Sequence, residues 1–311
     1  ELGFKGYVVS DCGAIKDIYA HHHLVETPEE AAAKSVKAGC DLNCGEAYES
    51  LFGALGYGLI LERDIDRALM NLFELRFMLG MFDADDRVPY AQIPVEAICS
   101  PANQALALEA ARQSLVLLKN EGHLLPLSKD LKRVAVIGPN ADDDLVLRGN
   151  YFGTPLQSVT VLEGIRSIVP GHTEVEFERG CEILGKDKKG IKAAAKLAKK
   201  ADVAIVVLGL SQQVEGEEGQ QEGLPEGTLS LGDRGDLALP GMQQALLEAV
   251  VATGTPVVLV LLNGSALAVN WAQEQIPAIL EAWYPGQSGG RAVAEALFGD
   301  YCPGGRLPVT F

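Results

Sequence analysis

An acidic residue follows a short apolar run near the start of the chain. Tyr7, Val8 and Val9 are aromatic or β-branched, which is typical of a strand buried on both faces. Asp11 comes just after this run, and Gly13 then allows the backbone to turn. A carboxylate at the C-terminal end of a barrel strand is well placed for catalysis, but an Asp after a strand also commonly caps the following helix. The residues and their spacing leave both roles open.

A second group of carboxylates lies in a long loop after another apolar run. Residues 203–209 predict a buried strand, and the loop that follows contains Glu215, Glu217 and Glu218. Functional loops of open parallel sheets lie at the carboxyl ends of the strands, and this loop satisfies that condition. A solvated charged loop is the alternative interpretation.

Other motifs point to chemistry less specifically. Residues 286–290 fit the G-x-S-x-G pattern of a nucleophile elbow, but no His follows Ser288, as the order of that catalytic triad requires. The consecutive His21, His22 and His23 point in different directions, so a polar loop explains them better than a metal site. No G-x-G-x-x-G or G-x-x-x-x-G-K-[ST] loop is present. The sequence therefore predicts neither a metal nor a nucleotide cofactor.

Length and charge limit the classes of protein to which the chain can belong. Its 311 residues can form two domains with a sizeable core. A net charge of −16 argues against a nucleic-acid partner, because phosphate binding depends on basic patches. No apolar run approaches the roughly 20 residues needed to span a bilayer, and no signal peptide is recognisable. We therefore expect neither a nucleic acid nor a membrane as a partner.

The expected elements fall into three parts. In residues 1–85, the capping box Thr27-Pro28-Glu29-Glu30 predicts a helix to about Lys37, and apolar spacing predicts another from Glu62 to Leu79, ended by Gly80. Residues 86–110 are a connector rich in Pro and small polar residues. Residues 111–311 alternate strands and helices, which predicts a mostly parallel sheet covered by helices. Strands are expected at 114–120, 134–140, 203–209, 256–262 and 278–283, and helices at 105–112, 191–200, 242–252 and 291–297.

Several stretches together resemble glycoside hydrolase family 3. They are "GFKGYVVSDCGAI" with "AAAKSVKAGCDLNCG", then "GLSQQVEGEEG" with "GDRGDLALPGMQQALL", and finally "WYPGQSGG" and "GGRLPVTF". The resemblance implies the C-terminal part of a (β/α)8 barrel in residues 1–85, a linker in 86–110, and an (α/β)6 sandwich domain in 111–311. It also implies that both ends are cut and that roughly six further βα units precede the chain.

The resemblance assigns roles to the two groups of carboxylates. Asp11 matches the nucleophile of these retaining exo-β-glycosidases, and the general acid/base falls at Glu215, with Glu217 as the alternative. Retaining hydrolysis requires the two carboxyl groups to lie about 5–5.5 Å apart. Asp11 would form the glycosyl-enzyme, while the acid/base would protonate the leaving oxygen and then activate water. Cys12 and Glu217 are expected at the sugar-binding site, and no cofactor takes part.

The resemblance also bears on the cysteines. In the β-xylosidase-like branch, the Cys after the nucleophile pairs with the Cys of a "DLNCG" segment, which implies a disulfide between Cys12 and Cys44. The alternative is that these cysteines are small buried hydrophobic residues. The six cysteines of the chain contain no CxxC pair with the spacing of a zinc site. A disulfide would imply an oxidising compartment, so we expect a secreted or periplasmic protein. Glucosidases of the family generally carry Trp after the nucleophile, so Cys12 favours xylose over glucose.

Two functions follow for testing. The first is a retaining exo-β-glycosidase that releases terminal β-linked xylose or glucose from an oligosaccharide or glycoside and needs the missing barrel segment of the same protein. The second is a non-catalytic sandwich fragment that acts in binding or assembly.

Overall fold

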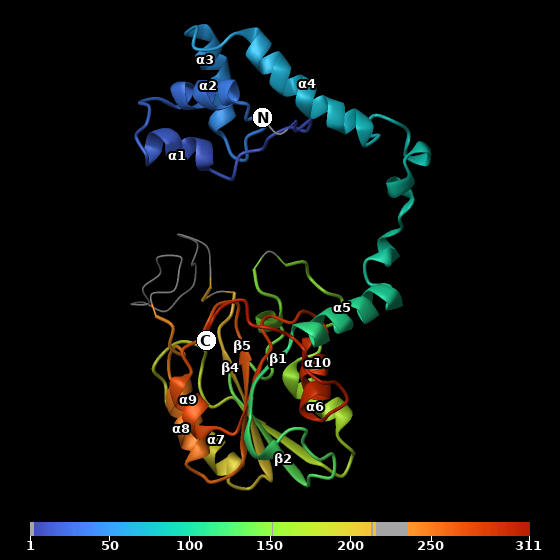
Figure 1. Ribbon diagram of the computed structural model, residues 1–311, viewed down its shortest axis with the longest axis vertical. Coiled ribbons are helices and arrows are strands. Elements are labelled where there is room, and N and C mark those ends of the chain that lie inside the picture. The colour runs from blue at the N-terminus through green and yellow to red at the C-terminus, as the bar shows by residue number, and fades with distance from the viewer. Residues whose placement is uncertain (1–2, 151, 213, 216–235) are drawn as a thin grey trace. The chain divides into compact units, whose positions relative to one another are not determined.

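The computed structural model describes residues 3–150, 152–212, 214–215 and 236–311 (Figure 1). The chain divides into two compact units, residues 1–95 and residues 96–311. The boundary falls inside the connector expected at 86–110, and each unit is described by itself below.

The first unit is mostly helical. Its helices are α1 (Ala14–Ala20), α2 (Pro28–Ala38), α3 (Leu51–Gly56) and α4 (Glu62–Met78). The predicted capping box of α2 is confirmed, because the Thr27 hydroxyl accepts from the Glu30 N–H at 3.2 Å and the Glu30 carboxylate accepts from the Thr27 N–H. Helix α4 ends as expected just before Gly80, whose φ is 73°. A small apolar core joins α2, α3 and α4 through residues such as Val36, Ala54 and Ala68.

The predicted strand at residues 7–9 differs from expectation. A single parallel bridge joins Val9 to Leu42, and the side chains of Val8 and Val9 are 47% and 52% exposed. The prediction of a strand buried on both faces is therefore wrong for the residues described. Such burial needs a neighbouring strand on each side, and within this unit the described part supplies only the segment at Leu42.

Short 3₁₀ turns lead from α4 to α5 (Pro101–Ser114). Helix α5 begins four residues before the expected start at Ala105, so its first turns occupy part of the predicted connector. Ser100 caps it by accepting from the Asn103 N–H at 3.3 Å, and Pro101 occupies the first helical position. The Ser-Pro pair thus begins a helix here instead of belonging to a linker.

The second unit contains a mostly parallel sheet, as predicted. Its strands run in the order β1-β6-β5-β4-β2-β3, and only the pairing of β1 with β6 is antiparallel among the described strands. The strands are β1 (Val116–Asn120), β2 (Arg133–Ile137), β3 (Glu174–Glu178), β4 (Val203–Gly209), β5 (Val257–Leu262) and β6 (Ala278–Glu281). Every residue of β4, β5 and β6 is buried, which accounts for their unbroken apolar character.

Helices cover both faces of this sheet (Figure 1). One face packs against α5, α6 (Val161–Ile168) and α10 (Gly289–Leu297), and the other against α7 (Ile191–Ala198), α8 (Gln243–Val251) and α9 (Asn270–Gln275). The sequence analysis did not predict β3, α6 or α9. Helices on both faces of a parallel sheet form the α/β sandwich expected for this part of the chain.

The end of β4 is held closely against its neighbours. Gly209 has a φ of 143°, and a Cβ there would lie 2.0 Å from the carbonyl oxygen of Leu262. The buried Gln243 side chain on α8 accepts from the Gly209 N–H and donates to the Gly209 carbonyl, each at 2.8 Å. Because β4, β5 and β6 are parallel neighbours, the loops after them leave the sheet at the same edge.

Candidate active site

Asp11 lies on a segment that is fastened on both sides. The Ser10 N–H donates to the Leu42 carbonyl at 2.9 Å, and the Gly13 N–H donates to the Cys44 carbonyl at 3.0 Å. A disulfide joins Cys12 to Cys44 with 4.4 Å between the Cα atoms, the pairing that the resemblance implies. This bridge and the two hydrogen bonds fix the backbone immediately before and after Asp11.

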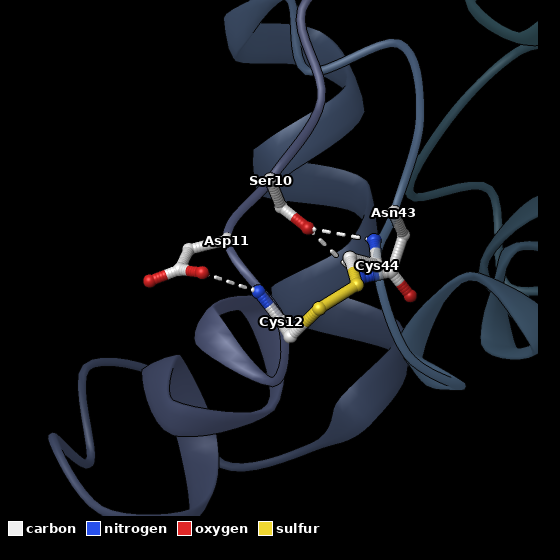
Figure 2. The surroundings of a disulfide bond; sticks show 5 residues. All are labelled: Ser10, Asp11, Cys12, Asn43 and Cys44. Carbon is white, nitrogen blue, oxygen red and sulfur yellow. Dashed lines mark hydrogen bonds between the residues drawn. A yellow bond between two sulfur atoms is a disulfide. The ribbon is translucent and has the colours of Figure 1, made fainter. Parts of the chain in front are cut away.

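The hydroxyl of Ser10 adds a further link between the two segments. It accepts from the Asn43 side-chain amide at 3.1 Å and from the Cys44 N–H at 3.0 Å (Figure 2). The Ser10 hydroxyl and the Cys12–Cys44 disulfide face residues 43–44, whereas the Asp11 side chain points to the other side of the chain (Figure 2). The carboxylate of Asp11 is thus displayed away from the segment that holds its backbone.

The Asp11 carboxylate has one partner among the residues described. Its Oδ1 accepts from the Cys12 N–H at 2.8 Å, and the residue is exposed. Gly13 occupies the N-cap position of α1 and no side chain caps that helix, so the alternative role of Asp11 as a helix cap is wrong. An exposed carboxylate on a fixed backbone has an oxygen available to attack an electrophilic carbon.

Glu215 lies in the second unit, in the loop after β4, and its carboxylate accepts four hydrogen bonds. The N–H groups of Gly264 and Ser265, in the loop after β5, each donate at 2.7 Å. The Ser265 hydroxyl donates to Oε1. Tyr284, a residue in the loop after β6, donates its hydroxyl to Oε2. The side-chain amide of Asn150 also donates to the Glu215 backbone carbonyl. Three loops at the carboxyl edge of the sheet therefore converge on one carboxylate.

A second carboxyl group, that of Glu281, lies close enough to Glu215 to be affected by its charge. Glu281 ends β6 and is fully buried, and its Oε1 accepts from the Trp283 N–H at 2.7 Å. Burial raises the pKa of Glu281 to about 8, although the Trp283 N–H and a hydrogen bond with Asn263 act in the opposite direction. The negative charge of Glu215 raises this pKa further.

The predicted site residues fall on both units. Asp11, Cys12 and Cys44 belong to the first unit and Glu215 to the second. Glu217, the alternative acid/base and expected sugar contact, lies outside the described residues.

The sequence analysis missed the groups that surround Glu215, which are Asn263, Gly264, Ser265, Glu281 and Tyr284. Two signals were available, since polar residues directly follow the predicted strand at 256–262, and Tyr284 belongs to the "WYPGQSGG" stretch. That stretch forms a turn, in which the Gly286 N–H donates to the Leu147 carbonyl at 2.7 Å before α10 begins.

Two further features of the described residues concern the histidine run and the helices. His21 follows α1 and pairs with Asp17 of that helix at 2.8 Å, and the described part of the chain has no group of three or more His, Cys, Asp or Glu able to hold a metal ion. No helix in the ranges that the structure covers is both long and apolar enough to cross a bilayer.

Comparison with known proteins gives one family for both units. Residues 1–75 match the family described as "Glycosyl hydrolase family 3 N terminal domain", and residues 115–311 match "Glycosyl hydrolase family 3 C-terminal domain". Among curated proteins, the chain is 43% identical over 317 aligned residues to "Probable beta-D-xylosidase 7" from Arabidopsis thaliana. The match covers 100% of this chain and 39% of that protein.

Solved structures agree with this match. A family 3 exo-β-xylosidase in complex with a xylobiose aziridine activity-based probe superposes with a TM-score of 0.88 and 32% identity, over 98% of this chain and 38% of that one. A β-glucosidase from Erythrobacter marinus gives a TM-score of 0.84 at 32% identity, over 97% of this chain and 42% of that one. The chain thus spans about two fifths of the length of these relatives.

Proposed function

The chain belongs to glycoside hydrolase family 3, and we propose that the protein containing it is a retaining exo-β-glycosidase that works through a glycosyl-enzyme intermediate. The observation that carries this proposal is the exposed carboxylate of Asp11 on a backbone fixed by hydrogen bonds and a disulfide. In the reaction, Asp11 attacks the anomeric carbon of the terminal sugar and the glycosidic C–O bond breaks. Fixing the nucleophile beforehand removes part of the entropy that this step would otherwise lose.

The second carboxyl group of the mechanism comes from the loop after β4. Glu215 is our first candidate for the general acid/base, which gives a proton to the leaving oxygen and then takes one from the attacking water. Glu217 is the alternative and lies outside the described residues. Asp11 belongs to the first unit and Glu215 to the second.

We propose xylose as the preferred terminal sugar and glucose as the alternative. Cys12 directly follows the proposed nucleophile and is tied to Cys44. Glucosidases of the family generally carry Trp at the position of Cys12, so the resemblance favours the β-xylosidase-like branch. The relative named as a xylosidase supports this choice, and the relative named as a glucosidase supports the alternative.

The setting of the reaction is also part of the proposal. Disulfides persist in oxidising compartments, so the Cys12–Cys44 bridge favours a secreted or periplasmic enzyme. Residues 1–85 are proposed to complete a (β/α)8 barrel together with a segment of the same protein that lies outside this chain. Activity is therefore expected of the complete protein.

Hydrolysis of aryl β-xylosides and aryl β-glucosides by the complete protein tests the proposal. Replacement of Asp11 by Asn should lower kcat/KM by about 10⁴-fold or more, as loss of a catalytic nucleophile does in other hydrolases. Asp17→Asn is the matched control, a partly exposed Asp in the same unit, and should stay within about 2-fold because surface substitutions have small effects. Binding of xylo-oligosaccharides without hydrolysis would instead indicate the non-catalytic function.

Azide identifies the acid/base. The Glu215→Gln and Glu217→Gln variants are assayed with an activated aryl glycoside and with substrates that have poor leaving groups. The variant of the true acid/base should lose about 10²- to 10⁴-fold in kcat/KM for the substrates with poor leaving groups. Azide needs no general base, so it should restore turnover of that variant and release a glycosyl azide of retained configuration. Absence of azide rescue in both variants would overturn the assignment to this loop.

A further inference from the structure

Glu281 is the buried acid that the proposed mechanism does not use. It ends β6 between two neighbouring strands, with Val116 of β1 and Leu261 of β5 as its Cα partners. Its side chain is fully buried, and Oε1 accepts from the Trp283 N–H at 2.7 Å. Within the described residues, no hydrogen-bond partner of Oε2 is found. A buried carboxylate with one unpartnered oxygen is unfavourable unless it takes up a proton.

Asn263 acts on this acid. It is also fully buried, and its side chain lowers the pKa of the Glu281 carboxyl through a hydrogen bond. A proton on the carboxyl would remove the buried charge, while Oε1 continues to accept from the Trp283 N–H. Among the described residues, the charged group that acts on Glu281 is Glu215, from the loop after β4.

The backbone next to Glu281 needs support. Trp283 has a φ of 57°, a left-handed conformation that is strained for a residue other than Gly. Two hydrogen bonds hold it there, from its N–H to Glu281 and from its indole N–H to the Ser114 carbonyl at 3.0 Å. Tyr284 follows directly and donates its hydroxyl to Glu215. The direction of the Tyr284 side chain therefore depends on the bond between Glu281 and Trp283.

Asn263 makes the corresponding link on the other side. Its amide donates to the Ser265 carbonyl at 3.0 Å, which closes the turn whose Gly264 and Ser265 N–H groups donate to Glu215. Glu281 therefore contacts both segments that supply donors to Glu215. We propose that Glu281 is a positioning residue, which fixes Tyr284 and the turn at residues 263–265 around the Glu215 carboxylate. The proposal rests on the proposed function, because it assigns this support to the loop that carries the acid/base.

Trp283 provides a direct probe that needs no enzyme activity. The chain contains two tryptophans, Trp271 and Trp283, so Trp271→Phe leaves Trp283 as the sole indole emitter. In that background, Trp283 emission should change with pH through one transition near pH 8, where Glu281 loses its proton. Glu281→Gln should abolish the transition, since Gln keeps a donor and an acceptor but does not ionise. Persistence of the transition in the Gln variant, or no transition in either protein, would refute the proposed arrangement.

Glu295→Gln is the matched control. Glu295 is a second buried Glu of the same unit and is only 6% exposed. It pairs with Arg112 and Arg291, and none of its ion pairs in the part of the structure described involves Glu215 or the residues that donate to Glu215. Its replacement should leave the Trp283 transition unchanged. A loss of the transition in this variant as well would mean that the signal reports general loosening of the domain and not Glu281.

Kinetics of the complete protein test the positioning role. Glu281→Leu should lower kcat by about 10- to 100-fold with a smaller change in KM, because a misplaced catalytic loop slows the chemical step. Glu281→Gln should restore kcat to within about 3-fold. Tyr284→Phe should cause a similar loss, and the Glu281→Leu/Tyr284→Phe double variant should lose little more, since both substitutions remove one shared interaction.

The two ways of failing are distinguishable. If the wild-type complete protein hydrolyses no glycoside, the proposed function fails while the Trp283 titration still decides where Glu281 acts. If hydrolysis is normal but the losses from the two substitutions simply add, Glu281 does not act through Tyr284 and the positioning role is wrong.

Discussion

The stability of the chain should depend on pH through one buried acid, Glu281. The pKa of this group is raised from 4.5 to about 8, mainly by burial. At about 1.4 kcal/mol per pKa unit, the difference between the pKa of Glu281 in the folded and in the unfolded chain corresponds to about 5 kcal/mol in the free energy of unfolding. That is a large fraction of the stability of an ordinary domain, so the effect is measurable.

The sign follows from the two protonation equilibria. Below about pH 4.5, Glu281 carries a proton in both the folded and the unfolded chain, and its contribution to stability is fully present. Between pH 4.5 and about 8 the unfolded chain releases the proton while the folded chain keeps it, so the free energy of unfolding falls as pH rises. The loss is about 1.4 kcal/mol per pH unit and ends once the folded state also ionises near pH 8.

Urea unfolding of the 311-residue chain at several pH values between 5 and 8 provides the assay. Trp283 emission in the Trp271→Phe background reports on the second unit, and Glu281→Gln is compared with its parent at each pH. Gln does not ionise, so the free energy of unfolding of the Gln variant, relative to that of the parent, should rise by about 1.4 kcal/mol for each unit by which the pH is raised. Glu295→Gln should show no such gain, because Arg112 and Arg291 outweigh burial and lower the pKa of Glu295. A difference between Glu281→Gln and its parent that stays constant across this range would refute the buried neutral acid.

The remaining predictions concern the two ends of the proposed site. Cys44→Ser removes the disulfide between Cys12 and Cys44, which are 32 positions apart in the sequence. This substitution should lower the free energy of unfolding of the first unit by about 3 kcal/mol, and adding a reductant to the variant should have no further effect. Gly264→Ala places a Cβ 3.0 Å from the Tyr284 ring and 3.2 Å from the Glu215 carboxylate, so it should lower the thermal stability of the second unit by about 1–3 kcal/mol; an unchanged melting temperature would contradict this packing. Glu215→Gln halves the acceptor capacity facing four donors and should cost about 2–4 kcal/mol in urea unfolding, whereas equal stability would mean that these donors find other acceptors.

Much of the fold could be predicted because local signals agree with the tertiary structure. The apolar runs at β4 and β5 are buried along their whole length, and the periodicity of α4 matches its observed span. Strand β3 was missed because Glu174–Glu178 lacks the unbroken apolar run by which β4 and β5 were found. Its alternation of charged and apolar residues is the pattern of an edge strand exposed on one face. Helix α6 was missed although Thr160 and Glu163 form a capping box that the sequence carries in full.

The site could be predicted only in part. Asp11 was found from its place after an apolar run and Glu215 from the resemblance, since each lies next to a recognisable motif. Glu281 carries no such signal, because a Glu in an apolar strand is common in sequences, and the motif that contains Tyr284 does not indicate which side chain it contacts. They acquire a role only when pairing of β4, β5 and β6 brings three loops to one edge. That contact is a property of the strand order, which spacing along the chain does not contain.

The hydrogen bonds of Glu215 set a condition on its catalytic role. A carboxylate has about four acceptor sites, and protein donors already use four at Glu215, from Gly264, Tyr284 and two groups of Ser265. A general acid must present an oxygen to the leaving group, so catalysis by Glu215 requires the bound sugar to displace one of these donors. The two hydroxyl donors can rotate away, whereas the two backbone N–H groups are fixed by the turn that Asn263 closes. If neither hydroxyl moves, Glu215 can only anchor the start of its loop, and the proton must come from Glu217.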